Sequence, residues 1–338
     1  MVKRVGTENC KDKMREKTNF VKPSMCPICR SSDGDLFSIE HFNVWDLYGC
    51  NNCDAQWWEP LKHPGREFYE DAYDMVGSSG DNAIGWGNTQ FIKNPPTHRG
   101  KLLDVGCCSG DFINVMRGKG FDVWGIDISR RTIDLARALY GLEHVYPETI
   151  EEFNTHGDTP KFDVVTFFEV IEHLDRPYEF IGEVKKVLES GGYLAFSTPD
   201  RECLRFGWHD SPPQHLFKWN ERVLRYMLER QGFEVVTLIR EPISAKYFSY
   251  LFFGSASPLS FGIASKIKSL LRKNRKEDPT KIDSALMSEQ HALLKCVEHG
   301  AKLKKKVFSV LVAPLVLIGK ILGLKWQSIY VVAKLTKS

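Results

Sequence analysis

Between residues 101 and 239, short apolar runs alternate with stretches in which apolar residues recur every three or four positions. Short apolar runs predict buried strands, and the longer spacing predicts amphipathic helices. The predicted strands are 101–105, 122–126, 162–168, 193–197 and 233–239, and the predicted helices are 111–119, 130–140, 177–189 and 221–231. This alternation favours a mostly parallel sheet with helices on both faces.

A further apolar run, residues 328–335 (SIYVVAKL), predicts a last strand of the same sheet. If this run returns to the sheet, the unusual stretch before it is an insertion between the last two strands. The predicted organisation follows from these patterns and from local composition. We expect a mobile tail at 1–20, a cysteine-rich module at 21–60, a connector at 61–100, the α/β core at 101–243, a basic and apolar helical insertion at 244–327, and the final strand with the C-terminus at 328–338.

The composition is that of a folded protein, with 42% hydrophobic and 26% charged residues in 338. A formal net charge of +3 gives no global argument for binding nucleic acid. The first 20 residues hold no apolar run of the kind found in export signals. Together with nine cysteines, this favours reduced thiols and a cytoplasmic location.

Four of the cysteines form a C-x₂-C-x₂₀-C-x₂-C pattern: Cys26, Cys29, Cys50 and Cys53. Two such pairs can bring four thiolates into a tetrahedron, which is the usual structural zinc site. A closed set of four sulfurs leaves no open position, so the zinc would be structural. Redox pairing within each C-x-x-C is the alternative, and two pairs together disfavour it. The sequence therefore predicts a zinc ribbon before the α/β core.

A second motif, DVGCCSG, lies between the first predicted strand and helix of the core. Glycines such as Gly106 and Gly110 allow a sharp turn and close approach of the backbone to a ligand. Asp127 ends the second predicted strand, where a carboxylate can accept hydrogen bonds from ribose hydroxyls. From these residues alone, a dinucleotide-binding dehydrogenase and a glycine-rich turn without ligand remain alternatives.

The segments LLDVGCCSG, WGIDIS and FDVVTFFEVIEHL, in this order and spacing, resemble the S-adenosylmethionine (SAM)-binding core of class I methyltransferases. The resemblance covers roughly residues 100–240. It implies a Rossmann-like α/β sheet of seven strands, with the zinc ribbon before it and the helical insertion before the last strand. The EVIEHL segment is not typical of dehydrogenases and favours the methyltransferase.

The resemblance also implies roles for individual residues. Gly106 and Gly110 would flank the methionine part of SAM, and Asp127 would hold the ribose. Asp104 would orient the loop and the amino group of the cofactor. Cys108 stands where the family usually has glycine, so the loop would lie slightly further from the cofactor.

Glu169, Glu172 and His173 follow the third apolar strand, and His215 can approach from the loop after the next strand. Two carboxylates and two imidazoles are ligands suited to a divalent cation. The set resembles the metal site of small-RNA 3′-end 2′-O-methyltransferases, and ubiquinone-biosynthesis O-methyltransferases carry a similar E-x-x-E-H segment. The resemblance implies Mg²⁺ holding the acceptor hydroxyls.

Without a metal, His173 or His215 would act as a general base. Glu169 is a candidate both for catalysis and for binding the cofactor. The alternative for the acidic residues is that they only stabilise a helix start.

Two other loops contain candidates for ligand contact. Glu148 and Thr149 are candidates to face adenine, with a solvated loop as the alternative. Arg201, His209 and Asp210 are candidates to line the substrate, with an ordinary surface loop as the alternative.

The stretch 244–327 contains an aromatic-rich run at 246–263, basic clusters, and an apolar run at 307–324. Pro314, Gly319 and Lys320 interrupt the second run, which disfavours a transmembrane span. Peripheral contact with the inner face of a membrane and a helical cap or dimer interface remain equal alternatives.

We therefore predict a SAM-dependent methyltransferase that methylates oxygen on a small-molecule, sugar or lipid-linked acceptor. Zinc ribbons resembling this one precede methyltransferase domains, including those of sugar methyltransferases. The alternatives are a metal-assisted RNA 2′-O-methyltransferase and a non-catalytic adaptor with a methyltransferase fold. The sequence leaves open the acceptor, methylation of oxygen against carbon or nitrogen, and the oligomeric state, with a homodimer as a candidate.

Overall fold

The computed structural model describes residues 22–70, 84–202, 211–242, 314, 316 and 326–336. The predicted tail and nearly all of the predicted insertion lie outside these residues. The chain divides into two compact units, of which the first comprises Met1–Arg201, Gly207–Arg240 and Ser328–Ser338, and the second Glu202–Phe206 and Glu241–Gln327. The first unit contains the structure discussed below. In the described part of the chain, no helix is long and apolar enough to cross a membrane.

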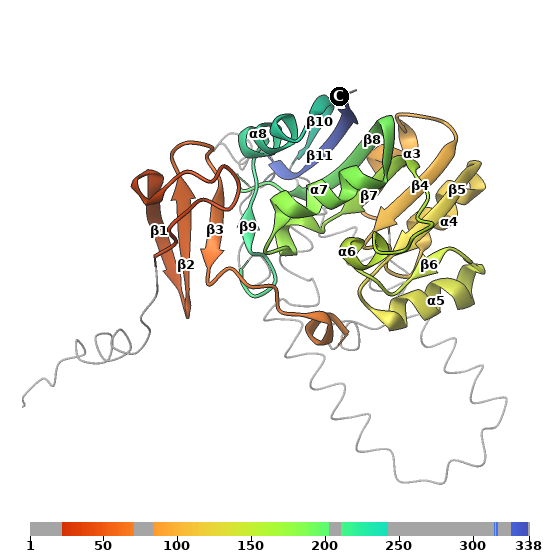
Figure 1. Ribbon diagram of the computed structural model, residues 1–338, viewed down its shortest axis with the longest axis horizontal. Coiled ribbons are helices and arrows are strands. Elements are labelled where there is room, and N and C mark those ends of the chain that lie inside the picture. Colours follow the sequence, from red (N-terminus) through yellow and green to blue (C-terminus); the bar gives the residue numbers. More distant parts are fainter. Residues whose placement is uncertain are drawn as a thin grey trace, which may run out of the picture. The chain divides into compact units, whose positions relative to one another are not determined.

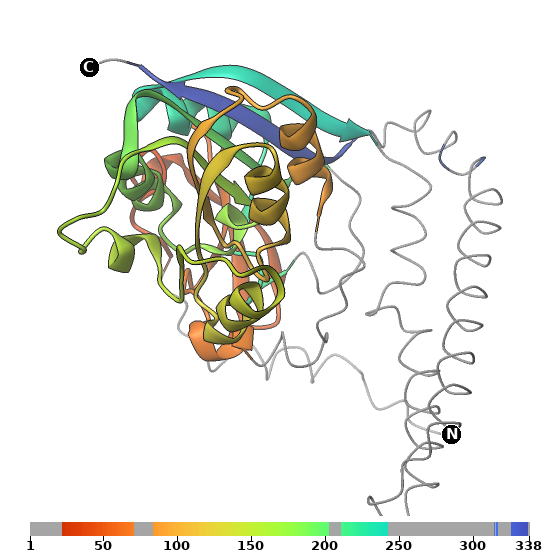
Figure 2. The same ribbon diagram turned by 90° about the vertical axis from the view of Figure 1, so that its right-hand side faces the viewer.

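Seven strands form the larger sheet (Figure 1). In spatial order they are β10 (Phe233–Pro242), β11 (Trp326–Leu335), β8 (Leu188–Pro199), β7 (Phe162–Phe168), β4 (Gly100–Val105), β5 (Phe121–Ile126) and β6 (Val145–Tyr146). The strands from β8 to β6 pair in parallel, and β11 pairs antiparallel with β8. Figure 2 shows β10 and β11 lying side by side. The predicted seven-stranded Rossmann-like sheet is confirmed.

Six helices and two short 3-10 turns have defined bounds, and residues 66–70 are also helical. The elements with defined bounds are η1 (Asp33–Asp35), α3 (Trp86–Lys93), α4 (Asp111–Gly118), α5 (Arg130–Tyr140), α6 (Ile150–Phe153), η2 (Ile171–His173), α7 (Pro177–Val187) and α8 (Glu221–Arg230). Helix α5 has the predicted bounds, because Ser129 caps its first turn and Gly141 ends it in the left-handed region, at φ 60°. The predicted helix at 177–189 is two residues too long, since the extended Leu188 begins β8 and pairs with Phe162.

The register of the sheet brings the predicted motifs together. Val105 at the end of β4 is the partner of Ile126 at the end of β5, and Asp104 is the partner of Thr166 on β7. Parallel strands that end side by side place their following loops at the same edge. Three segments therefore lie next to one another: the loop of the DVGCCSG motif at 104–110 (the glycine loop), the turn after β5 and the loop after β7.

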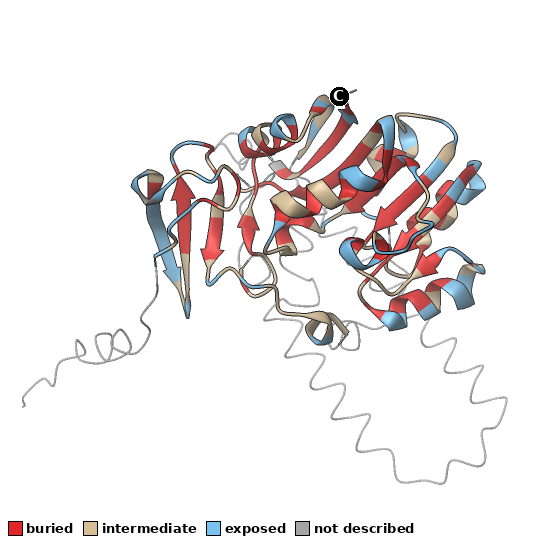
Figure 3. Ribbon diagram, viewed as in Figure 1, coloured by how far each residue is buried: buried red, intermediate tan, exposed pale blue. Residues whose placement is uncertain are grey.

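A second sheet contains the cysteine-rich module. Its strands, in spatial order, are β1 (Leu36–Phe42), β2 (Trp45–Cys50), β3 (Gln56–Glu59) and β9 (Phe217–Lys218). The fourth strand comes from the α/β core, with Trp57 paired to Phe217. Trp57, Phe217 and Trp219 are buried in the same hydrophobic cluster as core residues of the large sheet. Figure 3 shows buried residues continuing from β2 and β3 into β9.

Asp54 binds this module to the core through its side chain. Arg201 donates to Asp54 Oδ2 at 2.6 Å, and Asn220 donates to the same oxygen at 2.8 Å. Burial alone would raise the pKa of Asp54, but these two hydrogen bonds and the charges of Arg201 and Arg222 together hold the pKa below its ordinary value. Arg201, a candidate to line the substrate, therefore contacts the cysteine-rich module.

Candidate functional site

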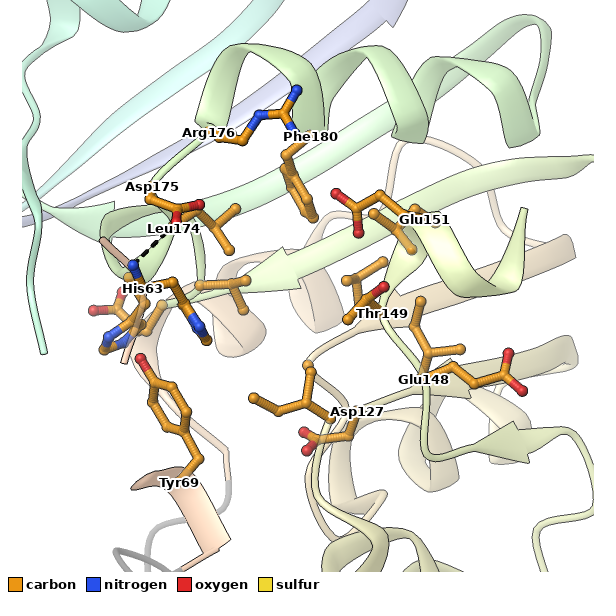
Figure 4. A pocket seen from close by; sticks show the side chains of 18 of the residues that line it. His63, Tyr69, Asp127, Glu148, Thr149, Glu151, Leu174, Asp175, Arg176 and Phe180 are labelled. Carbon is orange, nitrogen blue, oxygen red and sulfur yellow. Dashed lines mark hydrogen bonds between the residues drawn. The ribbon is translucent and has the colours of Figure 1, made fainter. Parts of the chain in front are cut away.

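A cavity of about 450 Å³ opens at the carboxyl edge of the large sheet. Its walls come from the loops after β4, β5, β6 and β7 and from the connector. Figure 4 shows Asp127 and Thr149 on one side and His63 and Tyr69 on the other. This location is where doubly wound sheets bind ligands, because strand ends and helix starts meet there.

In the glycine loop, Gly106 lines the cavity, and its backbone has φ 80°. A Cβ built on Gly106 would lie 2.7 Å from Val170 Cγ2, which is too close. Both the positive φ and the contact with Val170 therefore favour glycine at this position. Gly110 also has φ 80°, but among the described residues it packs against α5 and does not line the cavity. A Cβ there would lie 2.6 Å from Leu142 Cδ1. The predicted contact of Gly110 with the cofactor stays a prediction.

Cys108 lines the cavity in the left-handed region, at φ 48°. A side chain with a Cβ is strained there, which explains physically why glycine is usual at this position in the family that the sequence resembles. The Cys108 amide donates to Asp127 Oδ2 at 3.0 Å. This bond fixes the loop against the end of β5.

Asp127 faces the cavity, although its carboxylate is buried. Besides Cys108, it accepts hydrogen bonds from the Ser129 amide at 2.9 Å and the Thr132 hydroxyl at 3.2 Å. Burial raises the pKa of Asp127, and these hydrogen bonds oppose the rise. The carboxylate thus orients the loop and remains accessible to a ligand that donates hydrogen bonds.

Asp104 is buried behind the loop and does not line the cavity. The Thr166 hydroxyl donates to Asp104 Oδ1 at 2.6 Å. Burial raises the pKa of Asp104 to about 7, the Thr166 hydrogen bond opposes the rise, and the nearby Asp127 adds to it. Asp104 can therefore orient the loop, while its direct contact with a cofactor stays a prediction.

Glu169 lines the cavity directly after β7, with φ 55°. The Ser197 hydroxyl donates to Glu169 Oε1 at 2.8 Å, and the Glu169 amide donates to the Ser197 carbonyl at 2.9 Å. The structure does not bring Glu169 into the metal-type cluster formed by the other three predicted ligands. Its left-handed backbone turns the side chain toward Ser197 and the cavity instead.

Glu172, His173 and His215 lie together, with one ligand atom from each within 4.8 Å of the others. Glu172 is buried and accepts a hydrogen bond from the Thr198 hydroxyl at 3.0 Å. The His173 and His215 rings are 4.8 Å apart between centroids and meet edge to face. The sequence prediction that these three side chains converge is therefore matched by their positions.

His173 has a defined orientation. Its Nδ1 lies 2.8 Å from the Gln214 carbonyl, which can only accept, so Nδ1 carries the proton. Burial and, secondly, His215 lower the pKa of His173 to about 3. The ring is thus neutral, with the lone pair on Nε2, which lies 3.9 Å from Glu172 Oε1. This is the form of histidine that accepts a proton or binds a metal.

The connector supplies site residues that the sequence analysis missed. His63 and Tyr69 line the cavity next to His173, and Arg176 and Phe180 line it from α7 and the residue before it. The connector contains no recognisable motif, and its aromatic residues were the one sequence signal that pointed to the site.

Glu148 and Thr149, which were candidates to face adenine, also line the cavity. His209 and Asp210 lie outside the described residues.

Comparison with known proteins decides the family. A model of the methyltransferase domain matches residues 87–238. The ubiquinone biosynthesis O-methyltransferase of Pasteurella multocida (strain Pm70) is 38% identical over 186 residues, covering 44% of this chain and 77% of that protein. The chain belongs to the methyltransferase family.

Other relatives share shorter segments with this methyltransferase. The ubiquinone biosynthesis O-methyltransferase of Alkalilimnicola ehrlichii is 34% identical over 105 residues, and the chain spans 42% of its length. The corresponding protein of Actinobacillus pleuropneumoniae serotype 7 is 39% identical over 108 residues, with 46% of its length spanned. The matched segments cover 30% of this chain in both cases. A solved SAM-dependent methyltransferase from Archaeoglobus fulgidus is 16% identical, with a TM-score of 0.42, covering 80% of this chain and 94% of that one.

The four predicted zinc ligands of this methyltransferase converge. Cys26 and Cys53 Sγ are 3.6 Å apart, as are Cys29 and Cys50 Sγ, and one sulfur from each cysteine lies within 4.8 Å of the others. A disulfide would need about 2 Å. Tetrahedral thiolates at the usual Zn–S length would be separated by about 3.8 Å. The cluster is therefore compatible with zinc.

The strain at Cys108 predicts a difference between two variants. Cys108→Gly and Cys108→Ala both remove the thiol, but only alanine retains a Cβ in the left-handed region. We expect the glycine variant to be more stable by about 1 kcal/mol, measured by chemical denaturation. Equal stability of the two variants would contradict the strain at this position.

The buried Asp104 carboxyl predicts a pH-dependent gain in stability for Asp104→Asn. The folded-state pKa of about 7 lies above the ordinary 3.8, so wild-type stability falls as pH rises between these values. The asparagine variant lacks this fall and keeps an acceptor for Thr166. We expect its advantage to grow between pH 5 and pH 8, to the order of 2 kcal/mol. A difference that does not change with pH would show that Asp104 titrates normally.

Proposed function

We propose that the protein is a SAM-dependent O-methyltransferase acting on a small-molecule acceptor. One observation carries the proposal: a single cavity joins the glycine loop and Asp127 to the His173 side. A methyl donor and a hydroxyl acceptor can thus occupy adjacent positions in the same enclosed space. The relatives are named O-methyltransferases, which supports oxygen as the atom of the acceptor that is methylated.

For the cofactor, the residues fit a cationic, ribose-containing molecule. Gly106 and Cys108 form the wall nearest the end of β4, and Asp127 offers its carboxylate to ribose hydroxyls. Glu148 and Thr149 lie where the adenine would follow along the sheet edge. Bound SAM supplies an electrophilic methyl group on a sulfonium. The buried Asp127, which lines the cavity, favours that positive charge.

For the acceptor, His173 is the residue that receives the hydroxyl proton. Its Nδ1–H bond to the Gln214 carbonyl fixes the ring, so Nε2 presents a lone pair. Because burial and His215 lower the pKa of His173, the ring takes the proton only as the methyl group bonds to the acceptor oxygen and makes that proton strongly acidic. Holding the acceptor oxygen in line with the methyl group supplies the larger part of the rate enhancement.

A second candidate is metal-assisted methylation of an RNA 2′-hydroxyl. The observation that favours it is the convergence of Glu172, His173 and His215, whose oxygen and nitrogen atoms suit a divalent cation such as Mg²⁺. A cation there would lower the pKa of a bound hydroxyl. Transfer of methyl to RNA 3′ ends that requires Mg²⁺ would favour this candidate over small-molecule chemistry.

Structural zinc at Cys26, Cys29, Cys50 and Cys53 completes the proposal. A lipid-linked acceptor, peripheral membrane contact and a homodimer were all connected with residues 244–327 in the sequence. These residues lie almost entirely outside the described part, so the three ideas stay predictions.

The cofactor proposal predicts saturable binding of SAM and S-adenosylhomocysteine (SAH) in calorimetric titrations. Asp127→Asn removes the charge and should weaken binding by about tenfold or more. Asp122→Asn is the matched control, because Asp122 is exposed on β5, the strand that Asp127 follows. This variant should bind SAM and SAH as tightly as wild type does. Absence of SAM binding by folded wild-type protein would leave the non-catalytic adaptor as the better account.

The zinc proposal predicts one tightly bound zinc per chain by elemental analysis. Cys50→Ser should lose the metal and lower the melting temperature, because thiolate coordination contributes directly to folding. Cys107→Ser, whose sulfur is buried in the core, is the control and should retain the zinc. Wild-type protein purified without chelator and free of zinc would contradict the proposal.

A further inference from the structure

The Tyr69 hydroxyl is buried and has no hydrogen-bond partner among the residues that the structure describes. Buried polar groups in folded proteins are nearly always hydrogen-bonded, because an unmade bond costs free energy. An exception at the wall of a cavity points to a group that a ligand completes. Tyr69 belongs to the connector, outside both the glycine loop and the EVIEHL segment.

Tyr69 lies on the acceptor side of the cavity. Figure 4 shows its ring extending from the connector toward His63, on the side opposite Asp127. The ring stacks on His63 with centroids 5.3 Å apart and meets the edge of His173 at 5.8 Å. The hydroxyl thus adjoins the imidazole that receives the acceptor proton in the proposed function.

The connector is held where it places Tyr69. The His63 amide donates to Asp175 Oδ2 at 3.0 Å, next to the start of α7. Arg66 donates to the Pro147 carbonyl at 3.0 Å and to the Ile128 carbonyl, on the cofactor side of the cavity. Bonds to both sides of the cavity fix the segment, so the position of the Tyr69 ring is set before a ligand arrives.

The groups around Tyr69 define the chemistry of a ligand. A tyrosine phenol is protonated at neutral pH, so the Tyr69 hydroxyl can donate a hydrogen bond. A molecule in the cavity that carries an oxygen lone pair can accept this hydrogen bond, whereas an anion would be repelled by the nearby Glu172.

We infer that the connector supplies an acceptor-binding subsite in which the Tyr69 hydroxyl donates a hydrogen bond to an uncharged oxygen of the acceptor. The inference rests on the proposed function for the identity of the neighbouring cofactor site. It adds a specificity-determining residue from outside the methyltransferase motifs.

The test compares phenol with toluene, which has nearly the same shape but no oxygen, as ligands of the SAH-loaded full-length protein. Tyr69→Phe keeps the ring and removes the hydroxyl. Tyr193→Phe is the matched control, because Tyr193 lies in the middle of β8 and does not line the cavity. Dissociation constants for phenol, toluene and SAH are measured by calorimetry for all three proteins.

We expect Tyr69→Phe to bind phenol about five- to tenfold more weakly, the effect of one hydrogen bond, with toluene and SAH unchanged. Tyr193→Phe should match wild type for every ligand. Unchanged phenol affinity in Tyr69→Phe, an equal loss for toluene, or no phenol binding by wild type would each overturn the inference. If SAH fails to bind wild type, the proposed function fails, and the two probes titrated into free protein still decide the role of Tyr69.

Discussion

The arrangement of this site depends on one buried carboxylate. Asp127 directly follows β5 and accepts hydrogen bonds from Cys108 in the glycine loop and from Ser129 and Thr132 around the start of α5. Two segments that leave neighbouring strands are thereby fixed to the same side chain. Because the carboxylate is buried, these bonds are made in a low-dielectric environment and hold the loop firmly. The same group faces the cavity, so the structural bond and the predicted ribose contact share one residue.

The cysteine-rich module is part of the same folding unit as the α/β core. Its sheet takes β9 from the core, and Asp54 forms an ion pair with Arg201 at 2.6 Å. The connector that follows β3 then runs to the cavity, where His63 and Tyr69 line the wall. A change in the module can therefore reach the acceptor side through a short, anchored segment. This continuity gives the cysteine-rich module a physical route to influence the site without contacting the ligand.

The two sides of the cavity differ in their electrostatics. On the cofactor side, Asp104 and Asp127 are carboxylates whose pKa is raised by burial. On the acceptor side, His63 and His173 are held neutral by burial, next to the carboxylate of Glu172. A cation is favoured on the first side, and an uncharged molecule with a removable proton fits the second. This division suits transfer of a methyl group from a sulfonium to a hydroxyl.

The sequence by itself determined the parallel sheet, its main helices and the four convergent cysteines. Apolar periodicity and the spacing of cysteines are local signals that require no knowledge of distant contacts. Tertiary structure alone decided that Gly110 packs against α5, that Glu169 turns toward Ser197, and that β9 joins the sheet of the cysteine-rich module. It also decided that Tyr69 joins the site. These outcomes depend on backbone angles and on contacts between residues more than a hundred positions apart, such as His63 with Asp175, and no local pattern contains them.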